Sequence, residues 1–256
     1  MSWDPAQYLK FADHRLRPAI DLLGRIDAAA PRQVYDLGAG AGNVTRLLKQ
    51  RWPEARVTGF EESEAMLAKA ATVAPEITWE RANLASWTAP RPADVIYSNA
   101  ALHWLDDHAR LFPALLGALA PGGVLAVQMP RNFEAPSHTS IWEAARSGPW
   151  RARLEPLLRT APTSPPSFYF DVLAPRTATL DIWETEYQQV LEGAHPVAEW
   201  TKGTWLRPLL DALEEPERSQ FEAAYIERVD RAYPPRADGR TLFPFRRIFI
   251  IATAKR

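Results

Sequence analysis

The sequence has no cysteine among its 256 residues. Disulfide scaffolds, thiolate zinc sites and cysteine nucleophiles are therefore excluded. The formal net charge is only −1, so no overall field attracts nucleic acid or anionic lipid. No apolar run approaches the roughly 18 residues that a bilayer-spanning helix requires. We therefore expect neither a nucleic-acid partner nor a membrane partner.

The N-terminal segment lacks the basic start, the apolar block and the small-residue cleavage site of a secretory signal, which predicts a cytoplasmic protein. Lysine is scarce, since 25 of the 30 basic residues are arginine. Together with 23 prolines, this bias indicates genome base composition, so a single arginine carries little functional weight. A hydrophobic content of 46% and a charged content of 24% are typical of a globular protein with a sizeable core.

Short apolar segments alternate with helical patterns between residues 31 and 130. Strands are predicted at 34–37, 55–61, 77–84, 93–100 and 124–129, and helices at 44–51, 63–73 and 109–119. This alternation is typical of βαβ units and a parallel sheet. Near-continuous apolar strands such as residues 124–127 fit a sheet that is covered on both faces.

The rest of the chain has a different texture. A helix is predicted over residues 15–28, an antiparallel strand over 178–191 and a closing strand over 246–254. Residues 131–175 are proline-rich with short helical pieces, and 196–232 are helical with a break at Glu215-Pro216. These patterns predict a helical arm (1–30), a Rossmann-like core (31–130) and a final part (131–256). The final part combines the remaining strands with helical segments at about 131–175 and 196–232.

Gly38, Gly40 and Gly42 lie between a predicted strand and a predicted helix. Glycine permits a tight turn and lets the backbone approach a ligand at a helix N-terminus. The spacing differs from the dinucleotide fingerprint, because Asn43 stands where a glycine or alanine is needed, and no Gly-Lys-Ser/Thr follows as in a P-loop. Taken alone, the pattern also fits a purely structural turn.

Polar residues follow the next two strands. Glu61 ends the second strand, where a carboxylate can accept hydrogen bonds from two ribose hydroxyls, although an acid at a strand end is often only solvated. Asn83 and Leu84 follow the third strand, where an amide and the backbone can hold an adenine ring. The carboxyl ends of parallel strands are where open α/β sheets bind ligands. Together these residues predict a nucleoside site without phosphate-binding residues, which fits S-adenosylmethionine better than NAD.

The segment DLGAGAGN at 36–43 resembles motif I of the class I S-adenosylmethionine-dependent methyltransferases. More narrowly, the whole chain resembles the family of trans-aconitate 2-methyltransferases. The matching segments are residues 8–18, 36–43, 47–59, 98–113, 122–132, 181–187, 206–210 and 243–252. The family usually has Cys and Pro at the positions of Ala39 and Ala41, and Asp at those of Glu61 and Asn83.

The resemblance implies an α/β fold, namely a Rossmann-like sheet of seven strands with the last antiparallel, and a mainly helical cap from 1–30, 131–175 and 196–232. It implies S-adenosylmethionine as cofactor, S-adenosylhomocysteine as product, and a methyl ester formed on a small polycarboxylic acid, trans-aconitate. The cofactor-binding candidates are Gly38, Gly40, Gly42, Asn43, Glu61, Glu62, Met66, Asn83, Leu84, Asn99 and Ala100.

The acceptor chemistry sets the remaining expectations. A carboxylate is already ionised at pH 7, so no general base and no metal are required. His103 is a weak candidate base, which packing beside Trp104 explains equally well. Arginine suits the binding of carboxylates because its planar fork is bidentate. The substrate-binding candidates are Tyr8, Arg17, Trp104, Lys202, Arg207, Arg246 and Arg247, and we expect two of the five cations to be ligands.

Three alternatives remain at this point. A related small-molecule or acyl-carrier O/N-methyltransferase of the same fold would use His103 as a base. An NAD-dependent oxidoreductase is disfavoured by Asn43 and the absent third glycine of the fingerprint. A non-catalytic module could bind the nucleoside alone. A monomer or a weak homo-oligomer is expected in each case.

Overall fold

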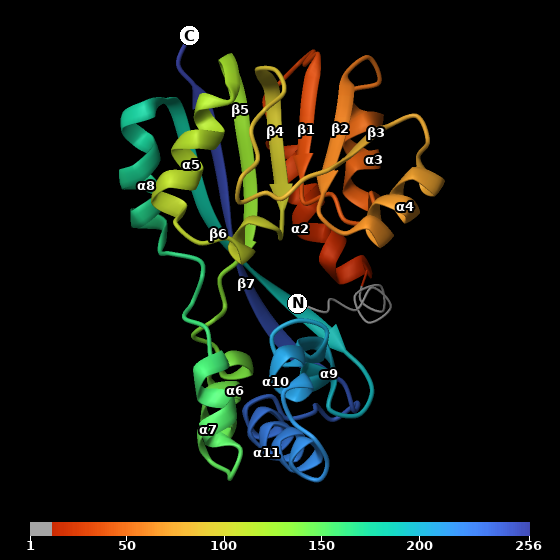
Figure 1. The fold of residues 1–256 in the computed structure, drawn as a ribbon, viewed down its shortest axis with the longest axis vertical. Coiled ribbons are helices and arrows are strands. Elements are labelled where there is room, and N and C mark those ends of the chain that lie inside the picture. Colours follow the sequence, from red (N-terminus) through yellow and green to blue (C-terminus); the bar gives the residue numbers. More distant parts are fainter. Residues whose placement is uncertain (1–11) are drawn as a thin grey trace. The chain divides into compact units, whose positions relative to one another are not determined.

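A computed structural model describes residues 12–256 of the chain (Figure 1). Its central element is a seven-stranded sheet with the order β3-β2-β1-β4-β5-β7-β6. The strands are β1 (Gln33–Leu37), β2 (Arg56–Glu61), β3 (Thr78–Arg81), β4 (Ala93–Asn99), β5 (Leu119–Pro130), β6 (Thr177–Leu191) and β7 (Thr241–Ala254). Strands β1 to β5 pair in parallel, and β7 is antiparallel to β5. The predicted fold class is confirmed.

Helices connect and flank these strands. They are α2 (Ala12–Gly24), α3 (Asn43–Arg51), α4 (Glu64–Val73), α5 (His108–Gly117), α6 (Pro136–Arg146), α7 (Arg151–Leu154), α8 (Pro166–Leu173), α9 (Pro196–Lys202), α10 (Arg207–Asp211) and α11 (Glu217–Ala232). Short 3₁₀ turns are η1 (Leu102–Trp104), η2 (Glu155–Leu157) and η3 (Ala174–Arg176). The strand order reverses between β1 and β4, which is the switch point where doubly wound sheets bind ligands at the carboxyl edge.

The chain divides into two compact units. The sheet unit contains Leu16–Pro130, Pro162–Thr185 and Arg247–Arg256, and the helical unit contains Arg131–Ala161 and Glu186–Arg246. The division differs from the sequence-based boundaries in two ways. Residues 16–30 and α8 belong to the sheet unit, whereas the distal parts of β6 and β7 belong to the helical unit.

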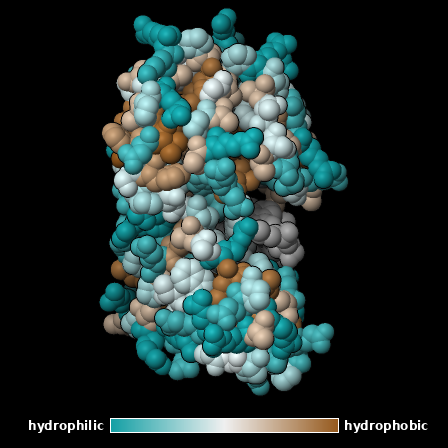
Figure 2. Space-filling model, turned by 60° about the vertical axis from the view of Figure 1, so that its left-hand side comes forward, coloured by the Kyte–Doolittle hydropathy of each residue, from teal (hydrophilic) through white to brown (hydrophobic). Residues whose placement is uncertain are grey.

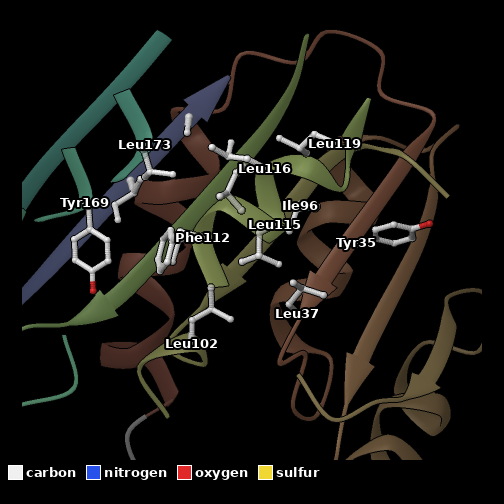
Figure 3. Close-up of a cluster of buried hydrophobic side chains, with 14 of the residues drawn as sticks. Tyr35, Leu37, Ile96, Leu102, Phe112, Leu115, Leu116, Leu119, Tyr169 and Leu173 are labelled. Atoms are coloured by element: carbon white, nitrogen blue, oxygen red, sulfur yellow. The ribbon is translucent and has the colours of Figure 1, made fainter. Parts of the chain in front are cut away.

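One face of the sheet is covered by α5 and α8. Side chains from these two helices pack on strand residues that point to this face, including Tyr35, Leu37 and Ile96 (Figure 3). Phe112 of α5 and Tyr169 of α8 are fully buried there. The Tyr169 hydroxyl lies 2.8 Å from His108 Nδ1, so the polar end of this large ring also has a partner.

The opposite face of the sheet is covered by α2. The buried Tyr97 of β4 donates a 2.9 Å hydrogen bond to the carbonyl of Ala19 in α2. Register places Tyr97 beside Asp36 of β1 and Ala126 of β5, so these three side chains share the α2 face. The same alternation brings further polar residues to this face at the carboxyl edge of the sheet.

The helical unit has a separate core of buried side chains from α6, α9, α10, α11 and the ends of β6 and β7. A buried polar network joins three of its segments. Tyr225 of α11 donates to the Ser137 carbonyl at 2.9 Å and lies 2.9 Å from Thr201 Oγ1 of α9. Burial raises the pKa of Tyr225 above its ordinary value, which keeps the hydroxyl protonated as a donor.

Several predicted elements have different bounds in the structure. The predicted helix 15–28 ends at Gly24, because Arg25 and Ile26 donate backward to carbonyls three residues away and close the last turn. The stretch 196–232, predicted to be helical with one break at Glu215-Pro216, forms three helices, so a second break separates α9 from α10. Strand β7 begins at Thr241 rather than residue 246, since residues 241–245 alternate between buried and partly buried in the pattern of a strand.

The surface view shows mostly hydrophilic residues with apolar areas between them (Figure 2). Among the residues whose burial the structure describes, the clearly exposed large apolar side chains lie on five different elements: Ile20, Val73, Leu157, Phe170 and Val190. Over residues 12–256, none of the helices has both the length and the apolar character that a membrane-spanning segment needs.

Candidate functional site

The glycine loop runs from the end of β1 to the start of α3. Gly38, Gly40 and Gly42 all have positive φ, at 81°, 55° and 82°. The amides of Gly38 and Ala39 both donate to the Phe60 carbonyl of β2, at 2.9 and 3.0 Å. These bonds fix the loop against the neighbouring strand, in a backbone conformation that glycine adopts most easily.

The three glycines differ in what surrounds them. A Cβ on Gly38 would lie 2.2 Å from the Cβ of Ala101, and one on Gly42 would lie 2.6 Å from the Trp79 ring. Packing alone therefore accounts for glycine at these two positions. A Cβ on Gly40 would meet no atom within 4 Å. Gly40 is thus the position of this loop where the backbone faces open space and a ligand can approach it closely.

Glu61 at the end of β2 is tied to this loop. Its Oε2 accepts from the Gly40 amide, and its Oε1 accepts from the amides of Glu62 and Ser63, each at 3.0 Å. These bonds hold the carboxylate in one orientation. Each carboxylate oxygen can accept more than one hydrogen bond, so capacity for ribose hydroxyls remains.

Asn83 lies beside the same group. Its Nδ2 donates to Glu62 Oε1 at 3.1 Å, and its Oδ1 accepts from the Ala85 amide at 2.9 Å. Leu84 lies next to the loop, with its Cδ1 3.7 Å from the position of a Cβ on Gly38. The structure thus brings together predicted residues from three strand ends, although they lie more than twenty positions apart in the chain.

Other cofactor candidates have distinct surroundings. Asn43 is exposed at the first turn of α3, whereas Met66 of α4 is buried, with its amide donating to Ser63 Oγ. Ala100 has a φ of 54°, and its amide donates to the Gln128 carbonyl at 2.9 Å. Asn99 precedes it at the end of β4, and its buried Oδ1 has no hydrogen-bond partner within residues 12–256. An acceptor of this kind suits a ligand that brings its own donor.

Asp36 was not among the predicted site residues. It is buried on β1, two residues before Gly38, and accepts a 2.6 Å hydrogen bond from Thr45 Oγ1 of α3. Desolvation raises the pKa of Asp36 to about 7; the Thr45 hydrogen bond opposes the shift, and the charge of Glu61 adds to it. A buried acid with a perturbed pKa near the carboxyl end of a parallel strand is typical of a functional site. The sequence signal was a carboxylate inside an otherwise apolar strand.

Three of the predicted substrate cations have carboxylate partners within the helical unit. Lys202 pairs with Glu199 at 2.7 Å and also with Glu222. Burial lowers the pKa of Lys202, but these two carboxylates outweigh it, so the net shift is upward. Arg207 Nε donates to both Asp211 oxygens at 2.9 and 3.1 Å, and Arg246 lies 3.9 Å from Glu186.

Two further cations belong to the sheet unit. Arg17 is exposed on α2, whereas Arg247 on β7 is 4% exposed. Arg247 Nη1 donates to the side-chain oxygen of Gln128 on β5 at 3.2 Å. Gln128 was also not among the site residues predicted from the sequence, although a glutamine inside the apolar run of residues 124–129 was a visible signal.

The last predicted residues lie around η1 and near the N-terminus. His103 is buried, with its ring centroid 4.7 Å from that of the partly buried Trp104. This contact fits the packing interpretation of His103. Tyr8 lies outside the described residues.

Comparisons with known proteins decide the family. A family model described as a methyltransferase domain matches residues 34–123, which include the glycine loop and Glu61. A protein of Azoarcus sp. (strain BH72) named trans-aconitate 2-methyltransferase is 49% identical over 251 residues, covering 98% of both chains. The chain belongs to the trans-aconitate 2-methyltransferase family. A family relative of the same name from Yersinia pestis (strain Pestoides F) is 44% identical and covers 99% of both chains.

Solved structures agree with this family at the level of the fold. The YcgJ protein from Bacillus subtilis has a TM-score of 0.61 at 14% identity, covering 94% of this chain and 99% of that chain. Phosphoethanolamine N-methyltransferase 2 from Haemonchus contortus has a TM-score of 0.56 at 13% identity, covering 94% of this chain and 53% of that chain. For this member of the trans-aconitate 2-methyltransferase family, the predicted methyltransferase class is confirmed, and the oxidoreductase alternative is not favoured.

Proposed function

We propose that this protein transfers the methyl group of S-adenosylmethionine to a carboxylate of trans-aconitate, giving the methyl ester and S-adenosylhomocysteine. The observation that carries the proposal is the 49% identity to a protein of that name, since it extends over 98% of both chains rather than over the cofactor motif alone. Incubation with methyl-labelled S-adenosylmethionine and a panel of mono-, di- and tricarboxylic acids tests it. Label should enter trans-aconitate in preference to monocarboxylic acids.

The residues at the carboxyl edge of the sheet fit the cofactor. Gly40 offers open space beside its backbone, Glu61 presents an oriented carboxylate, and Asn99 has a buried acceptor without a partner. In our proposal, Glu61 accepts from the ribose hydroxyls and Asn99 receives a donor of the methionine part. Bound S-adenosylmethionine would supply an electrophilic methyl group on its sulfonium for transfer to a carboxylate oxygen, with S-adenosylhomocysteine as the leaving group. The chain's part is then orientation and exclusion of water.

Changing Glu61 to glutamine should weaken S-adenosylhomocysteine binding by about 1–3 kcal/mol, because hydrogen bonds to a charged acceptor are lost or weakened. Calorimetry measures this directly. A cofactor analogue without the ribose hydroxyls should bind the wild type much more weakly than S-adenosylhomocysteine does. In Glu61→Gln, the two ligands should differ little in affinity. Equal losses in both proteins would show that Glu61 does not contact the ribose.

His103 should not act as a general base. A carboxylate acceptor is ionised near neutral pH, so kcat with trans-aconitate should stay nearly flat from about pH 6.5 to 9. His103→Ala should lower kcat only as far as lost packing on Trp104 explains. A pH–rate profile of both proteins checks this. A steep acid limb in the wild type that disappears in His103→Ala would instead support an acceptor that must be deprotonated.

The acid-binding residues remain predictions of this proposal. Arginine on a polycarboxylate is the expected interaction, and the candidates are Arg17, Lys202, Arg207, Arg246 and Arg247. Tyr8 and Trp104 stay predicted pocket residues. A cytoplasmic location and a monomeric or weakly oligomeric state also stay predictions.

A further inference from the structure

Gln128 is a buried amide that the proposed chemistry has not used. Its side chain is completely buried at the carboxyl end of β5. Its Oε1 accepts from Arg247 Nη1 at 3.2 Å, whereas its Nε2 has no hydrogen-bond partner in the part of the chain that the structure describes. Buried polar groups in folded proteins nearly always have partners, so a buried N–H group left without one points to a missing acceptor.

The position of Gln128 follows directly from that of the cofactor candidates. Glu61, the glycine loop and Asn99 lie at the ends of β2, β1 and β4, which are consecutive neighbours in the sheet. The next two strands are β5 and β7. Asn99 is the register partner of Gln128, so the two Cα atoms are about 5 Å apart and the side chains share one face.

Arg247 lies on the same face. Gln128 is the register partner of Phe249, and Arg247 precedes Phe249 by two residues on β7. The sheet therefore presents the cofactor candidates on one side of Asn99 and a buried amide and guanidinium on the other. An acceptor molecule that reaches toward a methyl group near Asn99 has these two groups within the length of a small polycarboxylic acid.

The chemistry of the pair matches a carboxylate. A primary amide N–H and a guanidinium fork are both donors, and a carboxylate offers two acceptor oxygens. Gln128 holds Arg247 through a neutral oxygen, so this contact orients the cation without cancelling its charge.

An apolar stack flanks the pair. The Trp183 and Phe249 rings are stacked with centroids 4.8 Å apart and an interplanar angle of 8°. Phe249 is completely buried and is the direct register neighbour of Gln128. Apolar neighbours keep the local dielectric low, which strengthens the attraction between a guanidinium and a bound anion.

We propose that Gln128 and Arg247 form the subsite for a non-reacting carboxylate of the polycarboxylic acid substrate. Gln128 donates Nε2 to that carboxylate and fixes the guanidinium of Arg247 beside it. This inference rests on the proposed function, since it names a specificity-determining residue for that substrate class.

Gln128→Met and Gln128→Glu test the subsite. Methionine keeps the length of the side chain but removes both polar atoms, and glutamate places a negative charge against Arg247 in the place of the substrate's carboxylate. Calorimetry with tricarballylate, a saturated tricarboxylate, is done on protein saturated with S-adenosylhomocysteine, so no turnover occurs. Gln128→Met should weaken tricarballylate binding by about 10-fold or more and Gln128→Glu by more, since the contact involves charged groups.

Two further readouts separate binding from folding. The affinity for S-adenosylhomocysteine should stay within about 2-fold of the wild type, because Gln128 serves the acid only. For trans-aconitate, KM should rise much more than kcat falls. Ser98→Ala is the matched control, since it removes a buried hydrogen bond to the Leu37 carbonyl on the opposite face of the same sheet edge. It should lower stability without changing tricarballylate affinity.

The outcomes distinguish the subsite from the function. A wild-type protein that methylates trans-aconitate, with Gln128→Met and Gln128→Glu that bind both cofactor and tricarballylate normally, would overturn the subsite and leave the function intact. A wild-type protein that neither binds tricarballylate nor methylates any polycarboxylic acid would overturn the proposed function. If Gln128→Met also loses S-adenosylhomocysteine binding, Gln128→Asn is the deciding variant. Asparagine keeps the amide but has a shorter side chain, so its amide nitrogen should not reach the carboxylate and tricarballylate affinity should fall. An unchanged tricarballylate affinity in Gln128→Asn would contradict the proposed contact from Nε2.

Discussion

Gly40→Val is expected to raise the dissociation constant of S-adenosylhomocysteine by about 100-fold or more, equal to about 2.7 kcal/mol. No protein atom lies within 4 Å of a Cβ at this position, so the new side chain occupies space that the cofactor needs. The φ of 55° adds strain, because a β-branched residue disfavours the left-handed region. Calorimetric titration of the purified variant measures the loss.

The control for this experiment is Gly239→Val. Gly239 has a φ of 80° in a turn of the helical unit, and a Cβ there would also meet no atom within 4 Å. This variant introduces similar backbone strain at a position outside the glycine loop, so its cofactor affinity should match that of the wild type. A folded Gly40→Val protein with wild-type affinity would show that the cofactor does not approach the loop at Gly40.

Asp36→Asn should change how stability depends on pH in the ligand-free protein. Burial raises the pKa of Asp36 from its ordinary value of 3.8 to about 7, so between these pH values the folded state binds more protons than the unfolded state. The free energy of unfolding of the wild type therefore falls as pH rises through this window, by about 4 kcal/mol from this group. Asparagine cannot ionise, yet its carbonyl still accepts from Thr45 Oγ1.

Denaturant unfolding of both proteins at about pH 4 and pH 8 checks this expectation. The free energy of unfolding of Asp36→Asn minus that of the wild type should be about 4 kcal/mol larger at pH 8 than at pH 4. Asp171→Asn, at an exposed position of α8, should not reproduce the shift. A constant difference across the two pH values would mean that Asp36 titrates alike in the folded and unfolded states.

Much of the fold follows from the sequence because its signals are local. The alternation of apolar strands and helices between residues 31 and 130 predicts β1 to β4 within a few residues of their bounds. Element ends were harder, because they depend on tertiary contacts. Leu119 opens β5 by pairing with Ala93, and the register then shifts before Val95, so a strand begins where the pattern favours a helix.

The candidate site could be predicted where a motif has a fixed spacing. The glycine loop, Glu61 and Asn83 were found in this way, and the structure brings them together. Asp36 and Gln128 were missed because their importance depends on burial and on a neighbour far along the chain. The hydrogen bond from Arg247 joins residues 119 positions apart, and no local pattern reports such a pair.

The place of β7 in the sheet has a consequence for synthesis of the protein. It lies between β5 and β6, yet a ribosome makes Thr241–Ala254 after every other strand. Gly40, Glu61 and Asn99 are made before Gln128, whereas Arg247 follows Gln128 by 119 residues, so Gln128 gains this partner only after β6 has been made. A message truncated before the codon for Thr241 would encode the strands that carry the cofactor candidates, but not Arg247 and therefore not the complete subsite that we propose for the acid.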